Sequence, residues 1–354
     1  EMCRQDILFF INLFSYQFNP KLKGKGREGA FITWKVQERL LLDRPPFGKG
    51  CIWCYDNDRT AVIEKSREMG ITWILLLFQD WLCRFHEGVQ CLNISKSEAA
   101  VDSKTRNSLF AKIEFINENV PDWMGKAIFT KMHVDYPWTR SEIAGEASTA
   151  RAGVGGRASV IFVDEYAEIK EDTAVRVRTA ATSDCRFFNS THLGTGTEFY
   201  ELTQSPEITK IQAHWTRHPL KNEGLYSFDP ETGKDRFWEY EEKTDSIMEI
   251  PHPKFRYALD FKFVRDGKPL GGPHPGIRSP WYDQKCIDMG SSHAAAMELD
   301  MDAAGSVEQF FDPLMIRELT MLCHDPFWEG RWYSTTSATS WNCRSSRTAL
   351  YDCG

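Results

Sequence analysis

The sequence predicts an α/β fold in which helices cover both faces of a mainly parallel sheet. Apolar segments without polar alternation are typical of strands that are buried on both faces. Four such segments occur, one that starts at residue 61 and three over residues 90–95, 159–165 and 185–191. Helical or loop segments separate them, which is the arrangement that connects parallel strands. Long helical stretches are expected from about Thr72 and over residues 98–117.

The rest of the chain is arranged around this core. A helical pattern near Val36 ends before Pro45, and a last helix is expected around residues 292–299. From Arg331 onward Ser, Thr and Arg dominate with little periodicity, which favours a linker. The predicted regions are an N-terminal region (1–60), the core (61–215), a lid or second subdomain (216–320), and a linker or aberrant truncated tail (321–354).

Composition narrows the classes of protein that the chain can represent. Its 354 residues are 42% hydrophobic and 26% charged, which is enough for a sizeable core. The formal net charge of −7 argues against a protein that coats nucleic acid through a broad basic surface. No apolar run reaches the roughly 18–20 residues that span a bilayer. The cysteines are irregularly spaced and Cys51 and Cys54 form a lone C-x-x-C pair, so we expect reduced, free thiols rather than a metal or redox site.

A candidate phosphate-binding turn lies between the first strand and the long helix. Such a turn needs backbone N–H groups, a glycine, a cation and a hydroxyl for Mg²⁺. In EKSREMGIT, Gly70 and Thr72 match the last positions of G-x-x-x-x-G-K-[ST], but Ile71 occupies the lysine position. Lys65 at the opposite end of the turn is the candidate replacement. The alternative is an ordinary strand–turn–helix, although the basic charge of Lys65 and Arg67 at a helix start opposes the helix dipole unless an anion binds.

Two carboxylates follow the third of the apolar segments. Asp164 and Glu165 stand at the carboxyl end of a strand, where ligands bind in open α/β sheets. Asp164 is expected to hold Mg²⁺, and Glu165 to orient and polarise the attacking water. The alternative is a pair of charges at which the strand leaves the core for solvent. The phosphate-binding turn upstream, in the order expected of a nucleotide hydrolase, favours the catalytic interpretation.

Polar and basic residues accompany the last two strands of the core. Ser190 and Thr191 end a strand before a glycine-rich turn, where a γ-phosphate sensor lies in stacked-strand NTPases, and a plain turn is the alternative. Arg151 and Arg157 lie in a glycine-rich loop before the acidic strand. Such a loop can deliver an arginine to the developing phosphate charge, contact DNA phosphates, or be solvated, and the sequence leaves these three interpretations open.

These motifs together resemble the large subunit of the terminase, the DNA-packaging motor of tailed bacteriophages. Many members have a turn of the form K-x-R-x-x-G-x-[ST], as in KSREMGIT. RAGVGGRASVIFVDEYA is similar to the family's arginine-rich and acidic pattern. NSTHLGTGTEFYEL is similar to its coupling motif, with His192 at a position that is often proline, and FITWKVQERL places Gln37 where members have an adenine-recognising glutamine. The resemblance spans about residues 5–315.

The resemblance implies a P-loop NTPase fold of the RecA-like (ASCE) type, with three layers and a small lid, that binds ATP and Mg²⁺. The residues that it assigns to ATP binding are Gln37, Lys65, Ser66, Arg67, Glu68, Met69, Gly70, Ile71 and Thr72. Those that it assigns to catalysis are Glu165, Arg67, which would contact the γ-phosphate, Arg151 and Arg157. Metal binding would fall to Thr72 and Asp164, and coupling of hydrolysis to movement to Ser190 and Thr191.

The implied function is ATP hydrolysis that drives double-stranded viral DNA into a procapsid. The expected partners are double-stranded DNA, the portal protein, the small terminase subunit and other copies in a homo-oligomeric ring, in the host cytoplasm and transiently at the portal vertex, without a membrane. Complete members add an RNase H-like nuclease, and the carboxylates after Asp302 lack a strand-centred pattern, so no nuclease activity is expected from this polypeptide. Two alternatives stay open: another ATP-driven nucleic-acid motor such as a helicase-like ATPase, and a degenerate nucleotide-binding scaffold without turnover, which Ile71 suggests.

Overall fold

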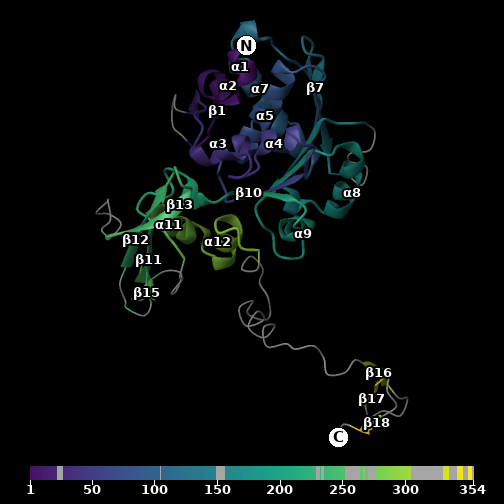
Figure 1. Cartoon of the computed structure of the whole chain (residues 1–354), viewed down its shortest axis with the longest axis vertical. Coiled ribbons are helices and arrows are strands. Elements are labelled where there is room, and N and C mark those ends of the chain that lie inside the picture. Colours follow the sequence, from purple (N-terminus) through teal and green to yellow (C-terminus); the bar gives the residue numbers. More distant parts are fainter. Residues whose placement is uncertain are drawn as a thin grey trace. The chain divides into compact units, whose positions relative to one another are not determined.

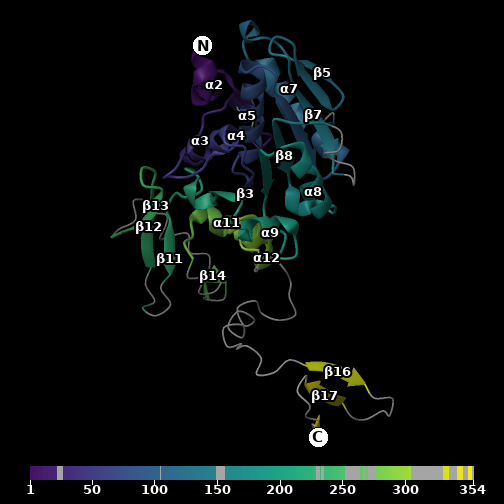
Figure 2. The same ribbon diagram turned by 45° about the vertical axis from the view of Figure 1, so that its right-hand side comes forward.

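The computed structural model divides the chain into two compact units, Glu1–Glu308 and Gln309–Gly354 (Figures 1 and 2). The structure describes residues 1–21, 27–103, 105–148, 156–228, 232, 235–251, 264–265, 268–269, 276–303, 330–334, 341–345 and 350–352. Within these ranges, every helix is too short or too polar to cross a membrane.

An eight-stranded sheet forms the centre of the first unit (Figure 1), and its strand order is β10-β3-β9-β8-β4-β7-β6-β5. The pairings from β10 to β7 are parallel, and those of β6 and β5 are antiparallel. In sheet order the strands are β10 (Thr209–Ala213), β3 (Ala61–Lys65), β9 (Arg186–Ser190), β8 (Val160–Asp164), β4 (Gln90–Ser95), β7 (Ser141–Ala147), β6 (His133–Tyr136) and β5 (Ile128–Thr130). The predicted α/β fold with a mainly parallel sheet is confirmed.

Helices cover both faces of this sheet, because successive side chains of each strand point to opposite faces. One set of strand residues packs against α5 and the N-terminal helices: Ala61, Ile63, Cys91, Val160, Phe162 and Phe187. The alternate set packs against η3, α8 and α9: Val62, Leu92, Ile94, Ile161, Val163 and Phe188. The helices of the first unit are α1 (Met2–Gln5), α2 (Ile7–Phe14), α3 (Lys35–Leu42), α4 (Cys51–Asp56), α5 (Ile71–Phe85), α6 (Glu98–Val101), α7 (Leu109–Asn119), η2 (Asp122–Met124), η3 (Tyr166–Glu168), α8 (Asp172–Thr182), α9 (Glu198–Gln204), η4 (Trp215–Arg217), α11 (Pro280–Met289) and α12 (Ser292–Glu298).

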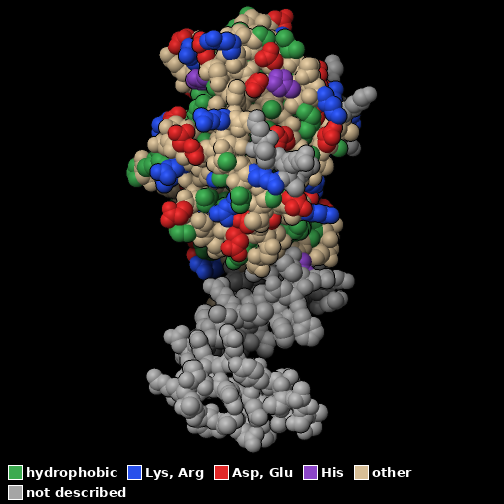
Figure 3. All heavy atoms as spheres, turned by 90° about the vertical axis from the view of Figure 1, so that its right-hand side faces the viewer, with side chains coloured by type: hydrophobic (Ala, Val, Ile, Leu, Met, Phe, Trp, Pro, Cys, Tyr) green, Lys and Arg blue, Asp and Glu red, His purple; other side chains and the backbone are tan. Residues whose placement is uncertain are grey.

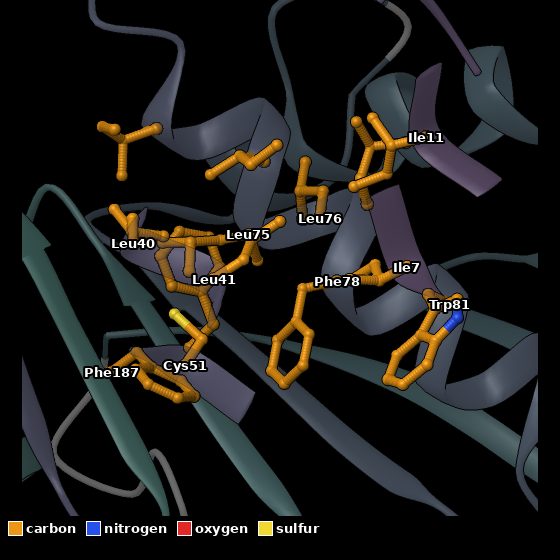
Figure 4. Close-up of a cluster of buried hydrophobic side chains, with 14 of the residues drawn as sticks. Ile7, Ile11, Leu40, Leu41, Cys51, Leu75, Leu76, Phe78, Trp81 and Phe187 are labelled. Atoms are coloured by element: carbon orange, nitrogen blue, oxygen red, sulfur yellow. The ribbon is translucent and has the colours of Figure 1, made fainter. Parts of the chain in front are cut away.

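Helix α5 is the central helix of the core (Figure 4). It begins after Gly70, whose φ of +68° ends the preceding turn, and its apolar residues are buried almost all round. Leu75, Leu76 and Phe78 are each at most 1% exposed. They contact side chains of α2, α3, α4 and β9. Because each buried side chain of this size stabilises the fold by about 1.5–3 kcal/mol, this packing holds the start of α5 in place against the sheet.

Two elements differ from the sequence predictions. The helix expected over residues 98–117 is divided into α6 and α7, because the Ser108 hydroxyl accepts a hydrogen bond from the N–H of Ala111 (3.3 Å) and starts a new helix. The three segments from Ile128 to Ala147 were not identified from the sequence: β7 pairs parallel with β4, and β6 and β5 extend the sheet beyond it with antiparallel pairings. Polar residues alternate along these strands, so they lack the continuous apolar run that marked the parallel strands.

The region after residue 216 contains a small antiparallel sheet of β11 (Tyr226–Phe228), β12 (Asp235–Glu241) and β13 (Ser246–Ile250). Asp245, in the turn between β12 and β13, pairs with Arg39 of α3 (2.9 Å) and Arg217 of η4 (3.1 Å). The Arg39 guanidinium also donates to the carbonyl oxygen of Glu242 (2.8 Å). This hairpin turn is therefore attached to α3.

Both units also contain short antiparallel strands. The first unit contains the antiparallel pairs β1 (Tyr16–Phe18) with β2 (Glu28–Ala30), and β14 (Val264–Arg265) with β15 (Lys268–Pro269). The second contains β16 (Gly330–Ser334), β17 (Trp341–Ser345) and β18 (Leu350–Asp352). The interpretation of residues 321–354 as a linker or an aberrant truncated tail stays a prediction.

The structure gives seven cysteines as free thiols: Cys3, Cys51, Cys54, Cys83, Cys91, Cys185 and Cys286. Cys51 and Cys54 are buried in the core, where burial raises the pKa of both thiols. A buried thiol with a raised pKa is unreactive. Among the described residues no group of His, Cys, Asp or Glu is arranged to hold a metal ion on its own. On the face in Figure 3, basic and acidic side chains are interspersed.

Helix α5 carries a fully buried ion pair that contacts strand β6 and the loop at Gly125. Arg84 pairs with Asp80 (2.8 Å), and both side chains are 0% exposed. Asp80 also accepts a hydrogen bond from the Tyr136 hydroxyl of β6 (2.7 Å), and Arg84 donates to the carbonyl oxygen of Gly125 (2.7 Å). Every strong donor and acceptor of the cluster therefore has a partner, which is the condition for keeping such a pair inside a protein.

We predict that Arg84→Met lowers the free energy of unfolding by about 3–5 kcal/mol, because it leaves the Asp80 carboxylate buried without its cation. Urea unfolding followed by circular dichroism measures the change. The double variant Arg84→Met with Asp80→Leu is the control, and it should recover part of the loss because no charge remains buried. An Arg84→Met variant as stable as the wild type would contradict this account of the cluster.

Candidate nucleotide-binding site

The turn between β3 and α5 has a backbone that only glycine fits at its last position. Gly70 has a φ of +68°, and a Cβ there would lie 2.7 Å from Nε2 of Gln37. That Nε2 donates to the carbonyl oxygen of Met69 (3.0 Å), and Oε1 of Gln37 accepts from the N–H of Trp34 (3.1 Å). Gln37 is 1% exposed, so in this structure it braces the turn rather than lining a cavity. Its predicted role in adenine recognition stays a prediction.

The start of α5 is free to bind an anion. Its N-cap residue is Gly70, and the helix has no side-chain cap. The first N–H groups of a helix lack partners within the helix, and the helix dipole places partial positive charge there. An uncapped helix start at the carboxyl end of a central parallel strand is the position at which phosphate groups bind.

Lys221 holds the backbone of the turn from the other side. Its Nζ donates to the carbonyl oxygens of Arg67 (2.7 Å) and Glu68 (3.0 Å) and lies 4.5 Å from the ring centre of Trp281. Lys221 is 5% exposed, and burial lowers its pKa to about 8. Glu68, whose φ is +60°, pairs with Lys21 through its side chain.

A cavity of about 420 Å³ lies in front of the turn. Its walls come from the turn, from the carboxyl ends of β3, β4 and β8, and from the segment that leads into α7. The lining residues are Lys65, Glu68, Met69, Gly70, Ile71, Thr72, Trp73, Ser95, Lys96, Ala99, Ala100, Thr105, Asn107, Ser108, Leu109, Lys112, Asp164 and Glu165. The structure thus brings the turn and both acidic residues to one cavity.

Thr72 and Asp164 converge on one side of this cavity. The Thr72 hydroxyl lies 3.1 Å and 3.3 Å from the two carboxylate oxygens of Asp164, and Nδ2 of Asn189 donates to Oδ1 (2.6 Å). Burial raises the pKa of Asp164, against the opposing effects of Lys65 and of this hydrogen bond. Oδ1 of Asn189 is buried beside the carboxylate without a hydrogen-bond partner among the described residues. This set of oxygen atoms fits Mg²⁺, which takes one or two protein ligands, water and substrate phosphates.

Glu165 follows in a left-handed backbone conformation, with a φ of +54°. This φ turns the chain away from the strand, and the side chain, 42% exposed, reaches Lys96 at the end of β4 (2.8 Å). Lys96 pairs equally closely with Glu168 of η3 (2.8 Å). The Glu165 carboxylate therefore lies at the cavity rim and is held there by a residue of the neighbouring strand.

Ser190 and Thr191 lie at and just after the end of β9, between the turn strand and the acidic strand. The Ser190 hydroxyl accepts from the N–H of Ala167 (3.2 Å), two residues beyond Glu165. The next residue, His192, contacts the buried Glu64 carboxylate on β3 (2.9 Å). The end of β9 thus contacts both neighbouring strands, with His192 at the position that is often proline. The coupling role of Ser190 and Thr191 stays a prediction.

Three further predicted residues, Ser66, Arg67 and Arg157, do not line the cavity. Ser66 is fully buried, and its hydroxyl donates to the carbonyl oxygen of Leu299 (2.5 Å). Arg67 pairs with Glu298 of α12 (2.7 Å) and is 58% exposed. Arg157 is exposed and precedes the amino end of β8, at the sheet edge opposite Asp164. Arg151 lies outside the described residues. The catalytic roles of these arginines stay predictions.

Four residues of this region escaped the sequence analysis: Asn189, Lys96, Lys112 and Lys221. Asn189 and Lys96 end or follow apolar strands, so the rule that placed Asp164 would also have found them. Lys112 lies inside α7, and Lys221 follows a segment without regular spacing from the turn. Only the three-dimensional fold brings these two lysines to the turn and the cavity.

Neither a protein family model nor a curated protein matches the sequence. The crystal structure of the HK97 bacteriophage large terminase matches 98% of this chain, at a TM-score of 0.51 and 11% sequence identity. The chain folds like a phage large terminase. It covers 66% of the HK97 protein.

Two further large-terminase structures are similar over shorter stretches. The ATPase domain of the Thermus phage P74-26 large terminase matches 45% of this chain and 76% of that domain, with 13% identity and a TM-score of 0.35. The large terminase of the thermophilic bacteriophage D6E in complex with ADP matches 51% of this chain and 45% of its own, with 12% identity and a TM-score of 0.40.

We predict that Lys221→Met lowers the free energy of unfolding by about 1–3 kcal/mol at pH 7, because two carbonyl oxygens of the turn lose their donor. The pKa of Lys221 is depressed in the folded state, to about 8, from the ordinary value of about 10.4. Wild-type stability should therefore rise as pH increases from about 8 to 10.4, since the unfolded chain binds the proton more tightly there.

Urea unfolding at a series of pH values measures both effects. The exposed lysine of β10 provides the matched control, Lys210→Met, which should keep the wild-type stability and the wild-type pH slope. If Lys221→Met shows the wild-type slope between pH 8 and 10, Lys221 is not the group that titrates.

Proposed function

We propose that the chain is an ATPase of the large-terminase type. One observation carries the proposal: an uncapped helix start, a lysine, a hydroxyl–carboxylate pair and a second carboxylate meet in one cavity at the carboxyl edge of the sheet. ATP hydrolysis needs these groups and no covalent chemistry from the protein, because the reaction is catalysed by positioning and by charge stabilisation.

Each group has a distinct role in this proposal. The N–H groups at the start of α5 and the ammonium of Lys65 bind the phosphate oxygens. Lys65 supplies the charge that Ile71 cannot, since the Ile71 side chain is 1% exposed in the apolar core. Thr72 and Asp164 hold Mg²⁺, which when bound neutralises phosphate charge and orients the phosphate oxygens.

Glu165 accepts the proton of the attacking water. The carboxylate is 42% exposed at the rim of the cavity, where water reaches it, and this position suits a general base. Lys96 holds this carboxylate at the rim of the cavity, and its ammonium also pairs with Glu168 outside the cavity lining. The coupling role of Ser190 and Thr191 belongs to the same proposal and rests on the contact of Ser190 with the chain beyond Glu165.

The proposed task of this activity is the movement of double-stranded DNA into a viral procapsid. The motifs in order along the chain and the likeness to the HK97 large terminase over 98% of the chain support it. In this proposal, copies of the chain form a ring on the portal protein and receive DNA from a small terminase subunit, in the host cytoplasm. Nuclease activity is a separate question, because the carboxylates from Glu308 to Glu329 lie outside the described residues.

We predict that Lys65→Ala weakens ATP binding by about tenfold to a hundredfold, because one charged hydrogen bond to phosphate is lost. Glu165→Gln should lower kcat by about a hundredfold to ten-thousandfold and leave ATP binding unchanged, since the proton is transferred only during the reaction. Phosphate release and equilibrium binding of a fluorescent ATP analogue measure the two quantities.

Glu168→Gln is the matched control for Glu165→Gln, because Glu168 binds the same lysine but lies outside the cavity lining. It should retain most of the wild-type kcat. A wild-type protein that binds ATP without releasing phosphate would instead support the scaffold without turnover. Normal hydrolysis by Lys65→Ala would refute the role of the displaced lysine.

We predict that the chain, with matching portal-bearing procapsids and linear double-stranded DNA, protects DNA from added nuclease only when ATP is present. Glu165→Gln should protect none, because movement requires hydrolysis. Gel analysis of the protected DNA measures its length. DNA unwinding in the absence of procapsids would support the helicase-like alternative instead.

A further inference from the structure

The cavity holds more cationic groups than the predicted turn supplies. Lys65, Lys96 and Lys112 reach it from three different elements, β3, the end of β4 and α7. The carboxylates that face them are Glu68, Asp164 and Glu165. How each lysine is already engaged decides which of them is available to a ligand.

Lys96 and Lys65 already interact with carboxylates of the site. Lys96 is shared by two carboxylates at 2.8 Å each, and its hydrogen bonds to Glu165 and Glu168 raise its pKa. Lys65 stands at the end of β3, at the start of the turn, and its charge favours the ionised form of Asp164. Neither lysine belongs to α7, which forms a further wall of the cavity.

Lys112 lies on that wall. Its Nζ donates to the backbone carbonyl oxygen of Asn107, and among the described residues it forms no ion pair. Burial lowers the pKa of Lys112, whereas the charges of Asp164 and Glu165 raise it. The ammonium is thus half-buried beside the two acidic residues of the site without a carboxylate of its own.

A half-buried cation without a counter-ion costs free energy, which an arriving anion recovers. The phosphates next to the nucleoside belong at the turn and the start of α5, and the terminal phosphate belongs beside Asp164 and Glu165, where water attacks. The cation of α7 shares its surroundings with these two carboxylates. It therefore faces the part of the ligand that a triphosphate has and a diphosphate lacks.

We propose that Lys112 is a specificity-determining residue that binds the terminal phosphate and discriminates a nucleoside triphosphate from a diphosphate. The inference rests on the proposed function of the site. Lys112 is then a second phosphate-binding cation, and it comes from outside the turn. Together with Lys65 it compensates for Ile71 at the usual lysine position. In this scheme Lys65 binds both nucleotides, and Lys112 binds only the longer one.

Equilibrium binding of ATPγS and of ADP, each with Mg²⁺, tests the inference on the full chain. Lys112→Met should weaken binding of ATPγS by about tenfold to a hundredfold, as expected for one charged hydrogen bond. It should weaken binding of ADP by less than about threefold, because the lost contact is absent from the ADP complex. Lys112→Arg, which keeps the charge, should restore most of the preference for ATPγS.

The control is Lys131→Met, which removes an exposed lysine outside the cavity and should leave both affinities unchanged. Lys112→Gln keeps a polar side chain of similar reach and provides a second neutral variant if Lys112→Met is poorly folded. Thermal unfolding of each variant without nucleotide verifies that the fold is retained.

Three results would overturn the inference. Equal losses for ATPγS and ADP would make Lys112 a general phosphate or structural residue. Unchanged binding of both nucleotides by Lys112→Met would remove it from the site while leaving the proposed ATPase intact. A wild-type chain that binds neither nucleotide would reject the proposed function itself, and the inference with it.

Discussion

The parallel register of β3, β9 and β8 is the constraint on which the site depends. In this register Glu64 lies opposite Ser190, and Asn189 lies opposite Asp164. The end of β9 is therefore held between the strand that leads into the turn and the strand that carries the acidic pair. Parallel strands have their carboxyl ends at the same edge of the sheet. The turn and the acidic pair, about a hundred residues apart in sequence, are therefore brought together by the strand pairing alone. A shift of one residue in β9 would turn Asn189 to the other face of the sheet.

The distribution of charge explains why a turn with Ile71 at the usual lysine position is compatible with this sheet. Position 71, where a lysine is usual, has its side chain in the apolar core, and an isoleucine there contributes to the packing of α5. The positive charge of the cavity comes instead from residues at the ends of β3 and β4 and from α7. Burial of Asp164 raises its pKa, so its ionised state depends on Lys65 and Asn189 close by. The charge balance is distributed over several elements rather than concentrated in one loop.

Much of this arrangement followed from local sequence patterns. The strand at 90–95, the turn with Gly70 and the acidic pair were predictable because apolar runs and strand-end polar residues are local signals. The antiparallel extension and the separation of α6 from α7 were not, because they depend on alternation and on a single capping serine. The cavity wall of α7 could not be derived either, since the position of Lys112 relative to Asp164 is set by packing between elements. Gln37 was identified as a functional residue, yet the structure gives its amide a bracing contact with the turn.

The attachment of the β12–β13 turn to α3 has a mechanical consequence. Arg39, which receives Asp245, lies two residues beyond Gln37 on the same short helix. The outer hairpin and the carbonyl oxygen of Met69 are thus both bound by side chains of α3, from positions two residues apart. A displacement of α3 along its axis would shift both contacts together.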